Sequence, residues 1–132
     1  MSLLLFDTTF LIDADRGGER LDSMIADDDD VAIAAITVAE LRVGVALSRG
    51  KARTTRQAFV DDVLAAVPVV SYDLDVAAEH AELLVAVRKQ GRPRGAHDLM
   101  IAATARATQR TVLTADSTAF ADLPDVLFRS HR

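Results

Sequence analysis

The sequence predicts an α/β fold in which helices cover both faces of a parallel sheet, and two patterns predict it. The first is a set of short runs that are mainly apolar on both faces rather than alternately apolar and polar, as expected for buried strands. The second is that segments with helical spacing lie between these runs. The runs are, in chain order, Leu3 to Phe6, Val31 to Ala34, Val67 to Val70 and Thr111 to Thr114, with Val126 to Phe128 as a weaker fifth candidate.

Three of the connecting segments are predicted to be helices. Two of them carry apolar residues at helical spacing, namely Phe59, Val60, Val63 and Leu64 in one and Ala77, Ala81, Leu84 and Val87 in the other. The third, from Leu99 to Ala105, is apolar nearly all round. We therefore predict that this helix is buried in the core or against a partner.

The composition fits one compact domain over residues 1–132, large enough to bury roughly two-thirds of its unfolded-chain surface. Hydrophobic residues make up 50% of the chain and aromatic residues 5%, so the core must consist mainly of aliphatic side chains and alanine. The chain has no cysteine, which excludes disulfides and zinc–thiolate sites and favours a reducing compartment, the cytoplasm. No signal peptide is expected, because Asp7 ends the first apolar stretch, and no run approaches the ~20 apolar residues of a membrane-spanning helix.

The net charge of −5 argues against a protein that coats nucleic acid through bulk electrostatic attraction. A polyanionic substrate would need local positive charge. Two bound divalent cations would remove most of the net negative charge and would place positive charge where a phosphate binds.

Four acidic residues stand where a predicted strand ends or a predicted helix begins: Asp7, Glu40, Asp98 and Asp116. Because open α/β sheets gather strand ends and helix starts into one crevice, we expect these carboxylates to converge. Converging carboxylates repel one another, and divalent cations are the usual remedy. Hard carboxylate oxygens without thiolates select magnesium or manganese over zinc or copper.

Each acid also has a purely structural interpretation. Thr37 to Glu40 is a capping-box pattern, and Asp7 and Asp116 could each cap a helix N-terminus, a contribution of ~1 kcal/mol. Asp98 is harder to explain in this way, because a carboxylate at the start of a buried helix needs a cation, several donors or a raised pKa. The interpretations are compatible, since a helix start can hold a carboxylate whose outward oxygen binds a metal.

Together these segments resemble the PIN-domain ribonucleases. The resemblance is carried by Asp7-Thr8-Thr9 after the first strand, Thr37 to Leu41 as Thr-x-x-Glu-Leu, Asp98 leading into Ile101-Ala102-Ala103-Thr104-Ala105, and Thr114-Ala115-Asp116 followed by Phe120. The ordered set runs from Leu3 to about Val126 and is far more specific than any one motif. More narrowly, the length and the single-domain layout resemble the VapC toxins of bacterial toxin–antitoxin pairs.

The resemblance implies a three-layer α/β/α domain around a central parallel sheet of four or five strands. It implies a magnesium- or manganese-dependent endoribonuclease that acts as a toxin, forms a homodimer and binds a cognate antitoxin. Asp7 and Asp98 would be the principal metal ligands, with Glu40 and Asp116 completing the acidic cluster directly or through water.

Two threonines would support this site in the family pattern. Thr8 would orient Asp7 or a water on the metal, and Thr114 would act likewise. The chain departs from the family pattern at Thr9, where Ser is common, and at Asp116, because Asn is common at or beside that position.

In the two-metal form of this chemistry, cations ~3.5–4 Å apart activate a water and stabilise the leaving 3′ oxygen, which yields 5′ phosphate and 3′ hydroxyl ends. A metal-free ribonuclease would instead want a pair of acid–base groups, usually histidines. We expect His80 to be an exposed helix residue and His131 to belong to the C-terminal tail. For His97 both substrate contact and local hydrogen bonding are open.

Two basic clusters could hold an RNA backbone. They are Arg49, Lys51, Arg53 and Arg56, and the RNA-binding candidates Arg88, Lys89, Arg92 and Arg94, which lead into Asp98. The structural alternative for the second cluster is a helix C-terminus capped by Gly91, where cations suit the helix dipole. With no tryptophan and one tyrosine, little surface is available for base stacking, so RNA shape and a few polar contacts would decide the target.

Helices that are apolar over more than one face indicate contact with another chain. A homodimer would explain part of this surface, and the segments from Leu41 to Leu47 and around Phe59 could hold an antitoxin helix whose cationic side chain enters the acidic crevice. A receiver-like phospho-acceptor domain would need a lysine after a late strand, and the only lysines are Lys51 and Lys89. The alternative to the enzyme is a catalytically inactive PIN-like module that binds RNA or protein, although such copies usually lose acids and this chain keeps all four.

Overall fold

The described residues, 1–17 and 24–131 of the computed structural model, alternate between strands and helices as the sequence predicts. Their elements in chain order are β1 (Leu3–Phe6), α1 (Thr8–Asp15), β2 (Asp30–Ala34), α2 (Ala35–Ala46), α3 (Gly50–Ala66), β3 (Val69–Val70), α4 (Leu74–Gln90), α5 (Ala96–Thr108), β4 (Thr111–Thr114), the 3₁₀ helix η2 (Ser117–Ala119) and β5 (Phe128–Ser130). None of the helices in this part of the chain is long and apolar enough to cross a membrane.

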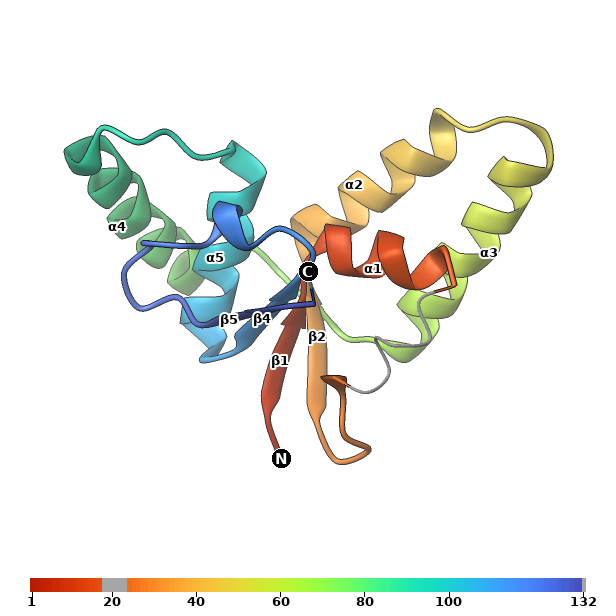
Figure 1. Ribbon diagram of the computed structural model, residues 1–132, viewed down its shortest axis with the longest axis horizontal. Helices are drawn as coiled ribbons and strands as arrows, with labels where there is room; N and C mark the ends of the chain where they lie inside the picture. Colours follow the sequence, from red (N-terminus) through yellow and green to blue (C-terminus); the bar gives the residue numbers. More distant parts are fainter. Residues whose placement is uncertain (18–23, 132) are drawn as a thin grey trace.

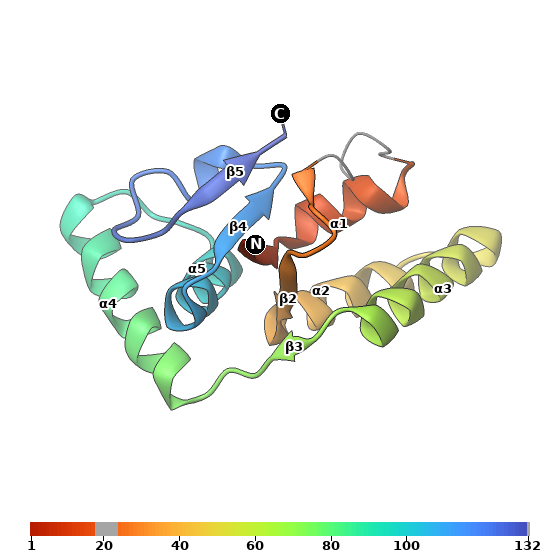
Figure 2. The ribbon, with the colours of Figure 1, turned by 90° about the horizontal axis from the view of Figure 1, so that it is seen from below.

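The strands form one five-stranded sheet in the order β3-β2-β1-β4-β5, and every neighbouring pair is parallel. The first strand lies at the centre, where Leu5 is level with Ala32 of β2 on one side and Val112 of β4 on the other. Seen from below, β3 and β5 form the two edges (Figure 2). The predicted α/β fold around a parallel sheet is confirmed.

Helices pack on both faces of the sheet, with α4 and α5 on one side and α1, α2 and α3 on the other (Figure 1). Because side chains alternate along a strand, Leu5 and Val112 pack against α4 and α5, whereas Leu4 and Leu113 pack against α1, α2 and α3. This two-sided burial explains why the strands read as continuous apolar runs. It gives the three-layer α/β/α arrangement.

The two edge strands differ from their predicted bounds. Val67 is the C-cap residue of α3 rather than a strand residue, so β3 is reduced to Val69–Val70. The last strand is Phe128–Ser130 rather than Val126 to Phe128, because the chain turns through Asp122 and Asp125, both at positive φ, and buries Val126 beneath that turn. Edge strands lack a neighbour on one side, which makes their limits hard to infer from sequence.

The helices are confirmed, with one shift of the buried face. The helix from Leu99 is buried as predicted, through residues Leu99 to Ala105 with Met100 only partly covered. In α4, Val87 is buried and Leu84 packs against the core as predicted, whereas Val76 and Leu83 are buried in place of Ala77 and Ala81. The larger side chains at positions 76 and 83 remove more apolar area from water, so the helix turns them inward.

Candidate functional site

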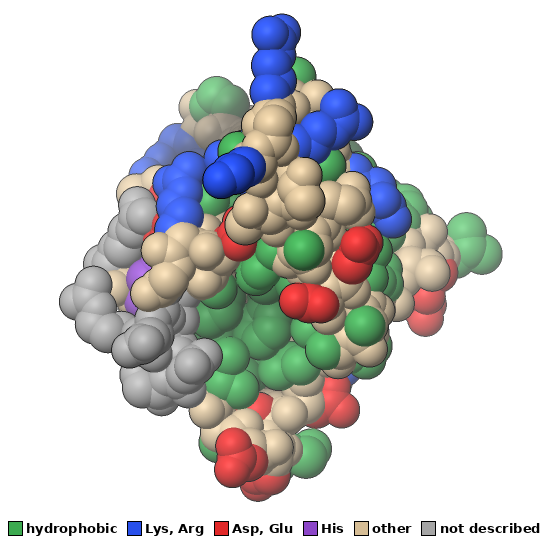
Figure 3. Space-filling model, turned by 90° about the vertical axis from the view of Figure 1, so that its right-hand side faces the viewer, with side chains coloured by type: hydrophobic (Ala, Val, Ile, Leu, Met, Phe, Trp, Pro, Cys, Tyr) green, Lys and Arg blue, Asp and Glu red, His purple; other side chains and the backbone are tan. Residues whose placement is uncertain are grey.

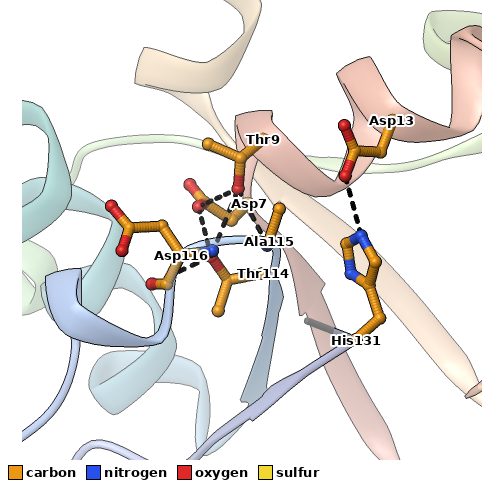
Figure 4. A network of polar contacts seen from close by, with 7 residues as sticks. All are labelled: Asp7, Thr9, Asp13, Thr114, Ala115, Asp116 and His131. Carbon is orange, nitrogen blue, oxygen red and sulfur yellow. Dashed lines mark hydrogen bonds and ion pairs between the residues drawn. The ribbon is translucent and has the colours of Figure 1, made fainter.

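Asp7 lies at the carboxyl end of the central strand, and its side chain is only 2% exposed. It is the N-cap of α1, where its Oδ1 accepts a hydrogen bond from the Thr8 amide at 2.9 Å. Its Oδ2 accepts from the hydroxyls of Thr9 and Thr114, both at 2.8 Å (Figure 4). Burial raises the pKa of Asp7; the three donors oppose that rise, and the charge of Glu40 adds to it.

The hydroxyls of Thr9 and Thr114 fix more than Asp7. Thr9 Oγ1 accepts from the Ala115 amide at 3.0 Å, and Thr114 Oγ1 accepts from the Asp116 amide at 2.9 Å (Figure 4). The start of α1 is therefore joined to the segment after β4. Thr114 was expected to support the site, whereas Thr9 was noted only as a family departure; its hydroxyl two residues after Asp7 was the available signal.

Glu40 lies inside α2 and does not form the predicted capping box. The helix begins at Ala35 with Ala34 as its N-cap residue, so Thr37 is not at the cap position that a capping box requires. The side chains of Thr37 and Glu40 contact Thr8 of α1 instead. The Thr8 hydroxyl donates to Glu40 Oε1 at 2.7 Å and lies 3.2 Å from the hydroxyl of the fully buried Thr37. Thr8 thus orients Glu40 through its hydroxyl and bonds to Asp7 through its amide, so its side chain does not orient Asp7 as expected. A role for Thr8 toward a water on the metal stays a prediction.

Asp98 is in the first turn of α5 and is partly buried. Its pKa is raised to about 6, first by burial and then by the negative charges of Asp7, Glu40 and Asp116, while His97 lowers it. Since each of the other three acids acts on Asp98, the fold brings all four predicted carboxylates into one electrostatic neighbourhood. Asp98 and Asp116 also line one hollow, and Glu40 lies beside His97, the residue before Asp98. That the four carboxylates act together on one ligand stays a prediction.

The remaining acid, Asp116, is exposed and caps η2, as its structural interpretation predicts. Its Oδ1 accepts from the Thr118 amide at 3.1 Å and from the Thr118 hydroxyl at 2.6 Å. The other carboxylate oxygen, Oδ2, makes no hydrogen bond to residues 1–17 or 24–131 and so keeps its lone pairs for another ligand. Asp116 therefore combines the cap with the free oxygen that a ligand role requires.

The four carboxylates do not form a closed metal cage. In residues 1–17 and 24–131, no three acidic, histidine or cysteine side chains are already gathered tightly enough to hold an ion by themselves. This arrangement fits magnesium, which usually takes one or two carboxylates and keeps waters or substrate oxygens as its other ligands. The donor set is all oxygen, apart from His97, whose Nδ1 lies 3.4 Å from Glu40 Oε2.

The other two histidines are held away from the acids. His80 is bonded to the Tyr72 hydroxyl at 2.8 Å and is partly covered rather than exposed. His131 is not a free tail residue, because its Nε2 lies 2.8 Å from Asp13 Oδ2 (Figure 4). Its ring also packs edge-on against Phe10. No histidine pair for metal-free chemistry is present in the described residues.

A hollow next to the acids is lined by basic and acidic side chains together. Arg92, Arg94, Asp98, Asp116 and Thr118 contribute to its walls. The candidates Arg88 and Lys89 are exposed in the last turn of α4 and do not line this hollow. Gly91 ends that helix in the left-handed conformation, at φ 64°, as the structural interpretation of this cluster predicts.

A second hollow, which we call the α1–α3 hollow, lies between α1, α2 and α3 and reaches Glu40. Its apolar lining includes Ile12, Leu41, Phe59 and Val60, and hydrophobic side chains gather in it on the face that Figure 3 shows. Arg56 of the first basic cluster also lines it. An apolar surface thus leads directly to one of the four acids.

Comparison with known proteins gives three concordant results. The family model of the PIN domain matches residues 4–126, a range that contains all four acids. Toxin FitB of Neisseria gonorrhoeae is 38% identical over 104 residues, which cover 76% of this chain and 73% of FitB. Ribonuclease VapC5 of Mycobacterium tuberculosis is 35% identical over 113 residues, covering 85% of this chain and 82% of the relative.

A solved structure agrees over nearly the whole chain. The crystal structure of VapBC-5 from Mycobacterium tuberculosis, a member of the VapBC family of toxin–antitoxin systems, matches with a TM-score of 0.82 and 28% identity. The match covers 98% of this chain and 99% of that one. The arrangement of strands and helices described above is therefore shared with that structure.

Proposed function

Because this chain belongs to the PIN domain family and is of the VapC type within it, we propose that it is a magnesium- or manganese-dependent endoribonuclease that acts as the toxin of a toxin–antitoxin pair. The observation that carries the proposal is how the acids are linked at one end of the sheet. Thr114 bonds to the Asp7 carboxylate and to the Asp116 amide. Thr8 bonds to Glu40, and Asp98 lines one hollow with Asp116. A fold that keeps four carboxylates together at one end of a sheet bears a repulsion that a bound cation would relieve.

Asp7 and Asp98 are the proposed principal metal ligands, and Glu40 and Asp116 complete the site directly or through water. The chemistry that bound magnesium supplies in such sites is the activation of a water and the stabilisation of the leaving oxygen of a phosphodiester. Burial favours this use, because partly desolvated carboxylates attract a cation more strongly than carboxylates in water.

Hydroxyl groups hold these carboxylates in place. Thr9 and Thr114 both donate to one oxygen of Asp7, which restricts rotation of its carboxylate. Thr8 donates one hydrogen bond to Glu40 and restricts that carboxylate as well. A site whose ligands are already oriented loses less conformational entropy when the cation and the substrate bind.

The toxin role rests on the relatives and on the α1–α3 hollow. The FitB and VapC5 relatives are named as a toxin and as a ribonuclease, and the similar solved structure is a toxin–antitoxin system. We propose that an apolar antitoxin segment occupies the α1–α3 hollow and that one of its cations reaches Glu40. The protein itself is proposed to be a homodimer whose substrate is RNA.

The experiment that tests the activity is incubation with a mixed pool of transfer and ribosomal RNA, with magnesium and then with EDTA. We expect discrete cuts with 5′ phosphate ends in magnesium and none in EDTA. Asp7→Asn and Asp98→Asn should abolish the cuts, whereas Asp75→Asn, which removes a first-turn acid from α4, should not. RNA that stays intact while it remains bound would instead indicate the catalytically inactive PIN-like module.

A further inference from the structure

Arg94 and Asp98 line one hollow, together with Arg92 and Asp116. The carboxylates at one end of this hollow repel a polyanion, and the chain as a whole carries a net charge of −5. An RNA strand that reaches Asp98 therefore benefits from a fixed positive charge on the same wall. Two arginines are available there, and their surroundings differ.

Arg94 is held in place by backbone oxygens. Its NH2 group donates to the carbonyl of Ala121 at 2.7 Å and its NH1 group to the carbonyl of Arg92 at 3.2 Å. The side chain is partly covered, and its Nε is buried without a hydrogen-bond partner in the described chain. Of the five N–H groups of a guanidinium, two are bonded here and Nε–H is buried, so one N–H on each terminal nitrogen remains for a ligand.

The charge of Arg94 is also uncompensated. Arg92 pairs with Asp122 at 3.2 Å, whereas no acidic side chain in residues 1–17 and 24–131 lies within ion-pair distance of Arg94. Backbone carbonyls orient a guanidinium without cancelling its charge. Arg94 is therefore the arginine of this hollow that keeps its full charge for a ligand.

Hydrogen bonds and an ion pair join the loop that carries Arg94 to the loop after η2. Gln90 Nε2 donates to the carbonyl of Asp122 at 3.0 Å, and the Arg92–Asp122 and Arg94–Ala121 contacts lie beside it. These three contacts join the segment before α5 to the segment that follows Asp116. The position of Arg94 relative to the acids is thus set before any ligand arrives.

We propose that Arg94 binds an RNA phosphate next to the one that is cut, and so places the scissile phosphate over Asp98. The inference rests on the proposed function in that it takes RNA as the substrate. A planar guanidinium suits a phosphate because its parallel N–H groups match two phosphate oxygens. Arg92 contributes less, because Asp122 already neutralises it, and Arg88 and Lys89 lie outside the hollow.

The test is to measure how binding to a short fluorescent single-stranded RNA depends on salt concentration, by fluorescence anisotropy. Calcium replaces magnesium as the divalent cation, and a gel verifies that the RNA stays intact. Loss of one phosphate contact lowers the slope of log K against log salt concentration by about 0.7 for a single strand. We expect Arg94→Gln to show this decrease and to weaken binding about tenfold. Arg94→Lys keeps the charge, so it should retain the slope and lose only part of the affinity.

Arg129→Gln is the matched control, because it removes an exposed arginine charge from β5; it should leave the slope and affinity near those of the wild type. If Arg94 serves only to hold the loops, Arg94→Gln will lower the thermal midpoint and keep the wild-type slope, which overturns the inference. Wild-type protein that binds no RNA overturns it as well. RNA that is bound through Arg94 but never cut would sustain the inference while removing the proposed ribonuclease activity.

Discussion

The hydroxyl of Thr114 donates to Oδ2 of Asp7 at 2.8 Å across 107 positions of sequence. The same hydroxyl accepts from the Asp116 amide, so one side chain links two of the four acids. The contact exists because β1 and β4 are parallel neighbours, so their carboxyl ends lie side by side at the same end of the sheet. The geometry of the site therefore depends directly on strand pairing.

Thr114→Val should reduce stability, because it leaves the buried carboxylate of Asp7 with one donor fewer and the Asp116 amide without its acceptor. We expect the free energy of unfolding in urea to fall by about 1–3 kcal/mol. Thr54→Val is the control, since Thr54 is exposed on α3 and its hydroxyl contacts only the Gly50 carbonyl. Equal losses of unfolding free energy in the two variants would show that the Thr114–Asp7 hydrogen bond does not stabilise the fold more than an exposed threonine does.

Gly95→Ala should displace the carboxylate of Asp98. A Cβ atom at residue 95 would lie 2.9 Å from Asp98 Oδ2, and the flexible carboxylate rather than the backbone would have to move. We expect magnesium affinity, measured by calorimetry, to fall at least about tenfold, as is usual when the support of a metal ligand is lost. The fold itself should be little affected.

Gly44→Ala provides the comparison for Gly95→Ala, because nothing lies within 4 Å of the added Cβ in the last turn of α2. That change should raise the free energy of unfolding by about 0.5–1 kcal/mol through helix propensity and should leave magnesium affinity unchanged. Magnesium binding of wild-type strength in Gly95→Ala would mean that Asp98 does not need its present position.

Asp98 makes stability depend on pH. Its pKa is about 6 in the folded chain against an ordinary 3.8, so between these values the folded state holds a proton that the unfolded state has lost. Stability from this group therefore falls as pH rises through that interval, and the cost is complete above the folded pKa. Asp98→Asn should be more stable than the wild type at neutral pH by about 1–2 kcal/mol, allowing for solvent screening.

Urea titrations at several pH values check this expectation. The difference between Asp98→Asn and the wild type should vanish below about pH 3, where the aspartate is protonated in both the folded and the unfolded state. Magnesium at neutral pH should stabilise the wild type more than it stabilises Asp98→Asn, because the cation favours the ionised carboxylate. If the difference in unfolding free energy between Asp98→Asn and the wild type were the same at every pH, it would not come from the charge of Asp98.

The α1–α3 hollow should be separable from catalysis. Ile12→Asp places a charge in its apolar lining, and we expect loss of binding to the antitoxin, tested by copurification with the product of the neighbouring open reading frame. RNA cleavage should persist. Val85→Asp, which adds the same charge at an exposed position on α4, should keep the partner; loss of binding in both variants would place the antitoxin elsewhere.

The continuous apolar runs made the buried strands predictable, because burial on both faces leaves no polar alternation. The edge strands were not predictable to the residue: a two-residue β3 and a β5 displaced past Val126 carry little periodic signal. The places of Asp7, Asp98 and Asp116 at a strand end or a helix start were predictable from the sequence. The roles of Thr8 and Thr9 were not, because their hydroxyl partners are set by how α1 packs against α2 and β4.

The local sequence pattern around Glu40 also failed to predict its contacts. Its spacing from Thr37 satisfied a local capping rule, yet α2 starts earlier, and both side chains turn toward Thr8 instead. A local pattern identified the right residue for the wrong local reason. Tertiary contacts from α1 decided the outcome.

The most direct test of the central claim, that these carboxylates jointly bind a divalent cation, is a manganese titration followed by the electron paramagnetic resonance signal of the free ion. The wild-type protein should remove that signal at low manganese, and Asp7→Asn and Asp98→Asn should each weaken binding by at least about tenfold. Asp75→Asn should bind as the wild type does. Manganese affinity that is the same in all four proteins would contradict the account.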